Sequence, residues 1–312
     1  MTNSRLRLVC AIIALFAALP IFAQQASNSS GTPVTMIVTV EPHHGAQVPV
    51  VNREDVMVNE GKERDQVTSW VPAHDQQAHL DLFLFIDDAS SFALSTQIGD
   101  LKKFVSSQEP TVKVGVAYMQ NGAASIVQDP TTDHQLAAKA LRLPEGVGGA
   151  EASPYFSLTD LIKRWPADGS RHEVLMVTSG IDLYYSPPDL SNPYLASAID
   201  AAQRAGVVVS AIYAPAAGHY GHSYWPNYWG QLYLSQLTEE TGGESYYVLF
   251  NGPAVDFSPY LKDVTNRLAR QYLLTFLPKP QTKPGWHSIK LRTELHDVDL
   301  VGAHRVYVPG SE

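Results

Sequence analysis

Hydrophobic and polar residues follow two different patterns along the chain. Between residues 80 and 278, short apolar runs alternate with amphipathic segments of helical period, which is typical of strands joined by crossover helices. The apolar runs predict strands at 81–87, 112–119, 123–127, 173–178, 206–213, 245–250 and 270–277. The segments between them predict helices at 94–107, 133–142, 154–165, 192–205, 229–241 and 256–269. We therefore predict an α/β fold with a mostly parallel central sheet and helices on both faces.

The strands predicted at 112–119 and 123–127 are too close in sequence for a crossover connection. Asn121 and Gly122 lie between them, and an Asn-Gly pair favours the two-residue turn of a β-hairpin. One edge of the sheet is therefore expected to be antiparallel.

On both sides of this region the pattern changes to alternation of β-branched and polar residues. Residues 33–75 and 279–312 have this pattern, with turn residues between the runs, and predict short antiparallel strands. The two flanks could pair with each other. We therefore predict a small β module beside an α/β domain of residues 80–278.

The first 23 residues have the pattern of a signal peptide. Arg5 and Arg7 precede an apolar stretch from Leu8 to about Leu19, which is short for a membrane span, and Ala23 offers a small residue for cleavage. An uncleaved signal that tethers the chain to a membrane is the alternative. Residues 24–32, QQASNSSGT, predict a flexible tether. We therefore expect an exported protein, located in the periplasm, at the cell surface or in the medium.

Charge and cysteine content narrow the classes of partner and cofactor. Loss of residues 1–23 would change the formal net charge from −9 to −11, and no run of Lys or Arg occurs elsewhere, so nucleic acid is not expected as a partner. Anionic lipid is disfavoured for the same reason. The single cysteine, Cys10, lies in the predicted signal, so the mature chain would have no disulfide and no cysteine metal site.

Three loops that follow predicted parallel strands carry unusual residues. The carboxyl ends of parallel strands share one edge of an open sheet, where ligands bind. The loops are Asp87-Asp88-Ala89-Ser90-Ser91, Ser179-Gly180-Ile181-Asp182, and residues 214–231. We expect any functional site at this edge.

The segments LFLFIDDASSF and VLMVTSGID, with the order of elements from 80 to 278, resemble the von Willebrand factor A (VWFA) domain. Three further segments resemble acidobacterial proteins that carry a related domain between β segments: VNREDVMVNEGKERDQVTSW, QLTEETGGESYYV and LRTELHDVDLVGAHRVYVP. The resemblance covers nearly the whole mature chain. It implies a Rossmann-like A-type domain clasped by the β flanks.

The resemblance also implies a metal-binding edge. Family members that bind Mg²⁺ use a loop reading Asp-x-Ser-x-Ser, a Thr from a second loop and an Asp from a third. Asp87 and Ser91 match the first loop, Ser153 matches the Thr, and Ser179 stands in place of the third-loop Asp. Ala89 stands in place of the first Ser and offers no oxygen ligand, and Ser179 is neutral where the family has an Asp, so the site lacks one ligand and one negative charge.

Two interpretations of these loops stay open. Asp88 and Asp182 could supply part of the missing charge, which would give a degenerate site for Mg²⁺ or Mn²⁺. The alternative is that the polar residues cap helices and turns and bind no metal.

The third loop is rich in aromatic residues and histidines. Exposed aromatic rings mark surfaces that bind proteins or sugars, although the rings could instead fold back into a local core. We expect a binding surface for an unknown protein or glycan, made by His219, Tyr220, His222, Tyr224, Trp225, Tyr228 and Trp229. A zinc site at His219 and His222 would require a helix, which Gly221 and Pro226 disfavour.

The favoured hypothesis is a non-enzymatic recognition protein that binds its partner at the carboxyl edge of a VWFA-like sheet. A second hypothesis is a secreted hydrolase acting on a glycan or ester, with Asp87, Asp88 or Asp182 as acid and base. A third is a structural subunit of a cell-envelope complex.

Overall fold

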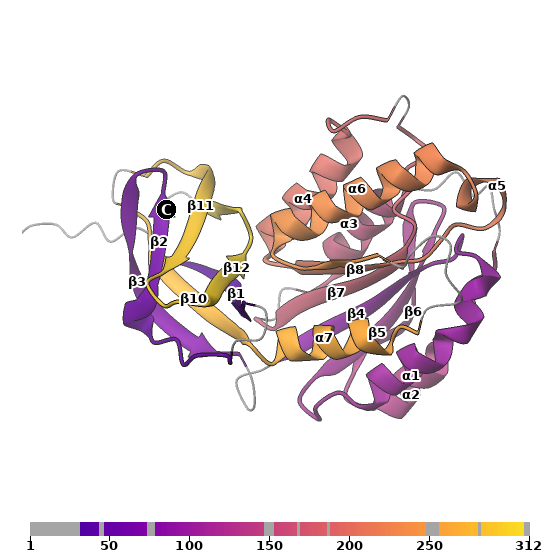
Figure 1. The fold of residues 1–312 in the computed structure, drawn as a ribbon, viewed down its shortest axis with the longest axis horizontal. Helices are drawn as coiled ribbons and strands as arrows, with labels where there is room; N and C mark the ends of the chain where they lie inside the picture. The colour runs from indigo at the N-terminus through magenta and orange to yellow at the C-terminus, as the bar shows by residue number, and fades with distance from the viewer. Residues whose placement is uncertain are drawn as a thin grey trace, which may run out of the picture.

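The computed structural model describes residues 32–43, 47–73, 79–146, 153–166, 169–185, 188–247, 256–279 and 282–308. The predicted signal peptide and all but one residue of the predicted tether lie outside these ranges. A seven-stranded sheet and a six-stranded sheet flanked by helices lie side by side (Figure 1). Within the described ranges, no helix is both long enough and apolar enough to cross a membrane.

The six-stranded sheet has the strand order β6-β5-β4-β7-β8-β9. All neighbouring pairs are parallel except β5 and β6, which form the predicted hairpin. Asn121 and Gly122 in its turn both have positive φ, 50° and 75°. The strands are β4 (Leu80–Asp87), β5 (Lys113–Gln120), β6 (Ala123–Thr131), β7 (Arg171–Thr178), β8 (Val208–Tyr213) and β9 (Ser245–Tyr246).

Helices cover both faces of this sheet, which confirms the predicted α/β architecture (Figure 1). In β4, Leu84 and Ile86 pack into the core under one layer of helices, and Phe83 and Phe85 pack under the other. One layer holds α1 (Ile98–Ser106), α2 (His134–Ala140) and α7 (Ser258–Leu268); the other holds α3 (Pro154–Arg164), α4 (Pro193–Ala205) and α6 (Tyr224–Thr241). The helix predicted from residue 94 begins as the 3-10 helix η3 (Phe92–Thr96) and continues as α1.

The flanks form the seven-stranded antiparallel sheet, with the order β12-β1-β10-β3-β2-β11-β13. Its core holds Val38, Val58, Leu274 and Phe276, all fully buried. The strands are β1 (Val34–Pro42), β2 (Val56–Glu60, after the 3-10 helix η1, Arg53–Asp55), β3 (Glu63–Pro72), β10 (Gln271–Leu277), β11 (Gly285–Thr293), β12 (Val298–Gly302) and β13 (Arg305–Val308).

The placement of β10 differs from the prediction. The strand forms where expected, but it pairs with β1 and β3 in the seven-stranded sheet instead of joining the parallel sheet. Leu274 and Phe276 are fully buried, whereas Leu273 and Thr275, on either side of Leu274, are only partly buried. Such alternation suits a sheet with one covered face, while β4, in a doubly covered sheet, is buried at every residue from Leu80 to Ile86.

A polar contact joins the two sheets. Arg267 of α7 is buried and forms ion pairs with Glu41 of β1 and with Glu244, which precedes β9. Arg171, at the start of β7, is also buried and donates a hydrogen bond to Gln271 of β10. Both arginines are buried, so loss of one of their partners would leave a charge or donor unpaired where the two sheets meet.

Candidate functional site

The loops after β4 and β8 are joined by backbone hydrogen bonds. The amide of Ser91 donates to the carbonyl of Pro215 at 2.9 Å, and the amide of Ala217 donates to the carbonyl of Ala89 at 2.8 Å. Ser90 and Ala216 form an isolated antiparallel bridge between these two contacts. The loops that were expected to share the carboxyl edge of the sheet therefore touch.

Asp87 links β4 to β7. The hydroxyl of Thr178 donates to Oδ2 of Asp87 at 2.7 Å, and the amide of Ala89 donates to Oδ1 at 2.9 Å. Burial raises the pKa of the Asp87 carboxyl above its usual value, which these hydrogen bonds only partly offset. Both carboxyl oxygens thus already have partners within the protein.

Asp88, the next residue, points to a different part of the structure. Its two oxygens accept hydrogen bonds from both terminal nitrogens of Arg142, at 2.6 and 2.7 Å, and further ones from Gln120 and the amide of Glu145. Burial alone would raise the pKa of Asp88, but these four hydrogen bonds outweigh it and hold the pKa below its usual value. Asp88 therefore secures the segment after α2 to the end of β4.

Asp182 supports the beginning of α4. It accepts hydrogen bonds from the amide of Tyr184 and from the side chain of Asn192, both at 2.9 Å. Asn192 in turn caps α4 by accepting from the amides of Tyr194 and Leu195. Asp182 therefore orients a capping residue, as the alternative interpretation of the polar loops predicts.

The predicted hydroxyl ligands are buried around the same edge. Ser153 precedes the first turn of α3, is completely buried, and its Oγ has no hydrogen-bond partner within the described residues. The hydroxyl of Tyr155, two residues later, donates to the carbonyl of Gly180 at 2.8 Å, so the start of α3 lies against the loop after β7. In that loop, Ser179 is buried and accepts a long hydrogen bond, 3.4 Å, from the amide of Ile181.

In this arrangement the residues do not fit a Mg²⁺ or Mn²⁺ site. Such ions require several free oxygen ligands, preferably carboxylates. Each oxygen of Asp87 already accepts one hydrogen bond, and Asp88 and Asp182 are held by Arg142 and Asn192. Among the residues that the structure describes, no group of three or more His, Cys, Asp or Glu could hold a metal. Of these three carboxylates, only Asp87 would have acceptor positions to offer a divalent ion, which falls short of the set of oxygen ligands that such an ion needs.

The segment predicted as an aromatic loop is largely helical. It contains α5 (Gly218–Gly221), and α6 begins at Tyr224, five residues earlier than predicted. Pro226 is the third residue of α6, where a backbone N–H has no partner inside the helix, so a proline costs little there. The expectation that Gly221 and Pro226 disfavour a helix in this segment was therefore wrong.

Four neighbouring rings on the first turns of α6 form what we call the aromatic cluster: Tyr224, Trp225, Tyr228 and Trp229. Tyr224 is 70% exposed, Trp225 is 66% exposed and Tyr228 is 47% exposed. Ring centroids lie 5.3 Å apart for Tyr224 and Trp225 and 5.8 Å apart for Tyr228 and Trp229. Trp229 also packs against buried Tyr233 at 5.8 Å. The cluster therefore has an exposed outer part and an inner ring that reaches the core.

The turn before the cluster is held by Asn227, a residue that the sequence did not single out. Its side chain is buried and donates to the carbonyls of Tyr220 and Ser223 at 3.0 and 2.7 Å, and it accepts from the hydroxyl of Tyr213 at 2.7 Å. Tyr220, one of the predicted binding residues, is 40% exposed on this turn. Asn227 thus gives the aromatic cluster a fixed base.

The predicted histidines and one unpredicted ring complete the edge. His219 lies 3.3 Å from the hydroxyl of Ser223, and His222 is exposed. Neither belongs to a metal-binding group within the described ranges, so the structure offers no support for zinc. Phe92, directly after the loop of β4, is 60% exposed. In the sequence, a large apolar residue directly after the polar Ser90 and Ser91 was the signal that could have identified Phe92 as an exposed ring.

No protein-family model matches the chain, and no curated protein matches it. Among solved structures, an aerotolerance-related membrane protein from Bacteroides fragilis is similar, with 12% identity and a TM-score of 0.44 over 61% of this chain and 98% of that one. A von Willebrand factor type A protein from Catenulispora acidiphila has 9% identity and a TM-score of 0.44, over 91% and 76%. The vWF domain of the type V pili tip protein Mfa5 from Porphyromonas gingivalis has 12% identity and a TM-score of 0.43, over 64% and 97%.

Two of the three solved structures have von Willebrand factor or vWF in their names. At this identity they say nothing about ligand or activity. The narrower likeness to acidobacterial proteins stays a prediction.

Proposed function

We propose that the protein is an exported, non-enzymatic recognition protein that binds its partner through the aromatic cluster at the carboxyl edge of the six-stranded sheet. The observation that carries the proposal is the exposure of three large rings, Tyr224, Trp225 and Tyr228, on a helix whose start is fixed by buried Asn227. Rigid aromatic side chains lose little entropy on binding and are frequent anchors in protein interfaces.

The partner that suits this surface best is a protein with an apolar pocket. The rings stand on the outer face of a helix, in edge-to-face pairs such as Tyr224 and Trp225, at an interplanar angle of 78°. Protruding rings of this kind can enter a pocket of a partner. A glycan, which would stack flat on one ring, is the other partner class that the test below distinguishes.

The acidic residues of the edge support a non-enzymatic role. A general acid or base needs a carboxyl group that can reach its substrate. Asp88 is held by Arg142, and Asp87 and Asp182 accept hydrogen bonds on both oxygens. The hydrogen bonds and ion pair of these three carboxylates within the protein give each of them a structural role, so no catalytic role is needed to explain them.

The test compares capture by the wild type with capture by the triple variant Tyr224→Ala, Trp225→Ala, Tyr228→Ala. Envelope proteins and a glycan array are presented separately, and bound species are quantified by mass spectrometry or fluorescence. We expect loss of one defined protein partner, while Leu136→Ala, which removes an exposed side chain on α2 in the other helix layer, leaves capture unchanged. Equal capture by the triple variant and the wild type would refute the assignment of the surface.

Export is part of the proposal and rests on the residue pattern of positions 1–23. The expected result is a processed protein, found outside the cytoplasm, whose first residue lies near Gln24. Amino-terminal sequencing of the protein from fractionated cells measures this directly.

A further inference from the structure

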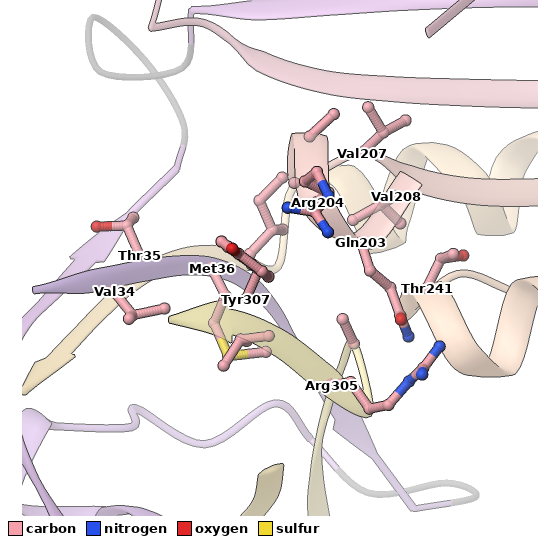
Figure 2. Close-up of a pocket in the computed structure, with 15 residues that line it drawn as sticks. Val34, Thr35, Met36, Gln203, Arg204, Val207, Val208, Thr241, Arg305 and Tyr307 are labelled. Carbon is pink, nitrogen blue, oxygen red and sulfur yellow. The ribbon is translucent and has the colours of Figure 1, made fainter. Parts of the chain in front are cut away.

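A cavity of about 370 Å³ lies where the two sheets meet, away from the aromatic cluster (Figure 2). It is bounded by the first residues of β1, the end of α4, the start of β8, and β13. The start of β8 is at the amino edge of the parallel sheet, so this cavity lies at the opposite edge from the site proposed above. Its volume is within the range of pockets that hold small ligands.

The cavity exists because two strands diverge. β12 pairs with β1 only from Val38 onward, and beyond Gly302 the chain turns to pair with β11 as β13. Among the described residues, the edge of β1 at residues 34–37 that faces the cavity therefore has no strand partner. The gap between this edge and β13 is covered on one side by the end of α4.

One wall of the cavity is apolar. Val34 and Met36 come from β1, Val207 and Val208 from the start of β8, and Val306 from β13, and each of the five is buried. Such a wall favours a ligand with a hydrocarbon or aromatic body.

The charged residues of the lining are both arginines, and no acidic residue lines the cavity. Arg305 is neutralised by Asp200, whose Oδ1 accepts its hydrogen bond at 2.7 Å. Arg204 has its guanidinium carbon 4.0 Å from the ring centroid of Tyr307 and 5.1 Å from that of Trp286. Within the described part of the chain no carboxylate forms an ion pair with Arg204. The cavity therefore carries one uncompensated positive charge, held in place by aromatic rings.

Gln203 provides a second observation that points to a ligand. It is 8% exposed, and its amide nitrogen donates to the carbonyl of Glu240 at 2.6 Å. Its Oε1 is buried and has no hydrogen-bond partner in the part of the chain that the structure describes. Figure 2 shows the side chain reaching toward Thr241 and Arg305 at the polar end of the cavity. A buried acceptor without a donor is costly, and a hydroxyl or amide of a ligand would satisfy it.

We propose that this cavity binds a small monoanionic amphiphile, a carboxylate on an apolar body. The carboxylate pairs with Arg204, whose planar guanidinium suits two parallel hydrogen bonds. The apolar body packs against the valines and Met36, and the carboxylate alone is sufficient for binding; a hydroxyl on the apolar body adds a hydrogen bond to Oε1 of Gln203. This site is separate from the recognition surface proposed above and does not depend on it.

Isothermal titration calorimetry with the purified, exported protein tests the proposal. The probes are decanoate, decanol and decyltrimethylammonium, which share a ten-carbon chain and differ in charge. We expect saturable binding of decanoate at one site per chain, at least tenfold weaker binding of decanol, and no binding of the cation. Equal affinity for all three probes would show unspecific apolar association and would overturn the proposal, as would an absence of decanoate binding.

Two variants assign the binding to this cavity. Arg204→Gln should weaken decanoate binding at least tenfold with only a small fall in the unfolding temperature, because Arg204 is exposed and its contacts with the rings of Tyr307 and Trp286 are weak at an exposed site. Arg292→Gln removes an exposed arginine of β11 outside the cavity and should bind decanoate as the wild type does. Unchanged binding by Arg204→Gln, or an equal loss in both variants, would contradict the proposed site.

Discussion

The loop after β4 and the first turns of α6 lie on the same edge of the six-stranded sheet but use their side chains in opposite ways. In the loop, Asp87 and Asp88 are bonded to Thr178 and Arg142 inside the protein. On α6, Tyr224 and Trp225 face solvent. The difference shows that polar residues at a strand end indicate a ligand site only where internal partners leave them free.

The largest expected effect concerns the polar loop after β4. Arg142→Ala leaves the buried carboxylate of Asp88 without its charged partner, although Gln120 and the amide of Glu145 still donate to it, so we expect the free energy of unfolding to fall by about 3 kcal/mol at pH 7. Urea denaturation measures the change. Arg292→Ala, at an exposed position, should change it by less than about 0.5 kcal/mol. A loss below about 1 kcal/mol for Arg142→Ala would mean that the pair does not hold the loop.

The second prediction concerns the aromatic cluster on α6. Trp229 is half-buried against Tyr233, so Trp229→Ala should lower the free energy of unfolding by about 2 kcal/mol. Trp225 is mostly exposed, and Trp225→Ala should lower it by less than about 0.5 kcal/mol. Thermal or urea unfolding of both variants shows whether Trp229 stabilises the fold while Trp225 does not. Equal losses would show that the cluster is a single packed unit.

The third prediction uses the opposite pKa shifts of two adjacent residues. The pKa of Asp87 is raised by burial, so its carboxyl contributes stability below the ordinary aspartate pKa that is lost as pH rises through the folded pKa. The pKa of Asp88 is lowered, so its contribution is present above the ordinary pKa and is lost as pH falls through the folded value. Relative to the wild type, Asp87→Asn should therefore become less stable on acidification from pH 7 to pH 4.

Asp88→Asn is the matched variant for this comparison. It should be less stable than the wild type at pH 7, and the difference should shrink below pH 4 as Asp88 of the wild type takes up a proton. Unfolding by urea at several pH values follows both variants. If the stability of the two variants relative to the wild type changed with pH in the same way, the opposite pKa shifts assigned to Asp87 and Asp88 would be contradicted.

The smallest expected effect is that of metal. Because Asp88 and Asp182 are bonded inside the protein and leave Asp87 as the one carboxylate of the three to offer an ion, Mg²⁺ or Mn²⁺ at millimolar concentration should leave the unfolding temperature unchanged, and EDTA should not lower it. Thermal-shift titrations of the wild type and Asp87→Ala provide the measurement. A rise that occurs only in the wild type would show that Asp87 binds an ion.

The sequence predicted the parts of the fold that depend on local pattern. The apolar run of β4 and the Asn121-Gly122 turn both form as expected. The partner of β10 could not be predicted, because alternation shows that one face is covered but not which sheet covers it. Likewise, the role of Asp88 depends on Arg142, which is 54 residues away in sequence, and no spacing rule connects the two.

The site was predicted less well than the fold. The residues expected at the carboxyl edge do gather there, but the sequence gives no sign that Asp182 would orient Asn192. The start of α6 was missed because the glycines and Pro226 suggested a loop, whereas a proline in the first turn is compatible with a helix.

The position of β10 between β1 and β3 has a consequence for the order in which the protein can fold. β1 is the first strand of the sheet to be synthesised, yet its neighbours, β10 and β12, begin at residues 271 and 298. The whole α/β region is therefore made before β1 can pair. Until those later residues are made, the apolar strand β1 has no strand partner on either side, and an unpaired apolar strand is prone to aggregation.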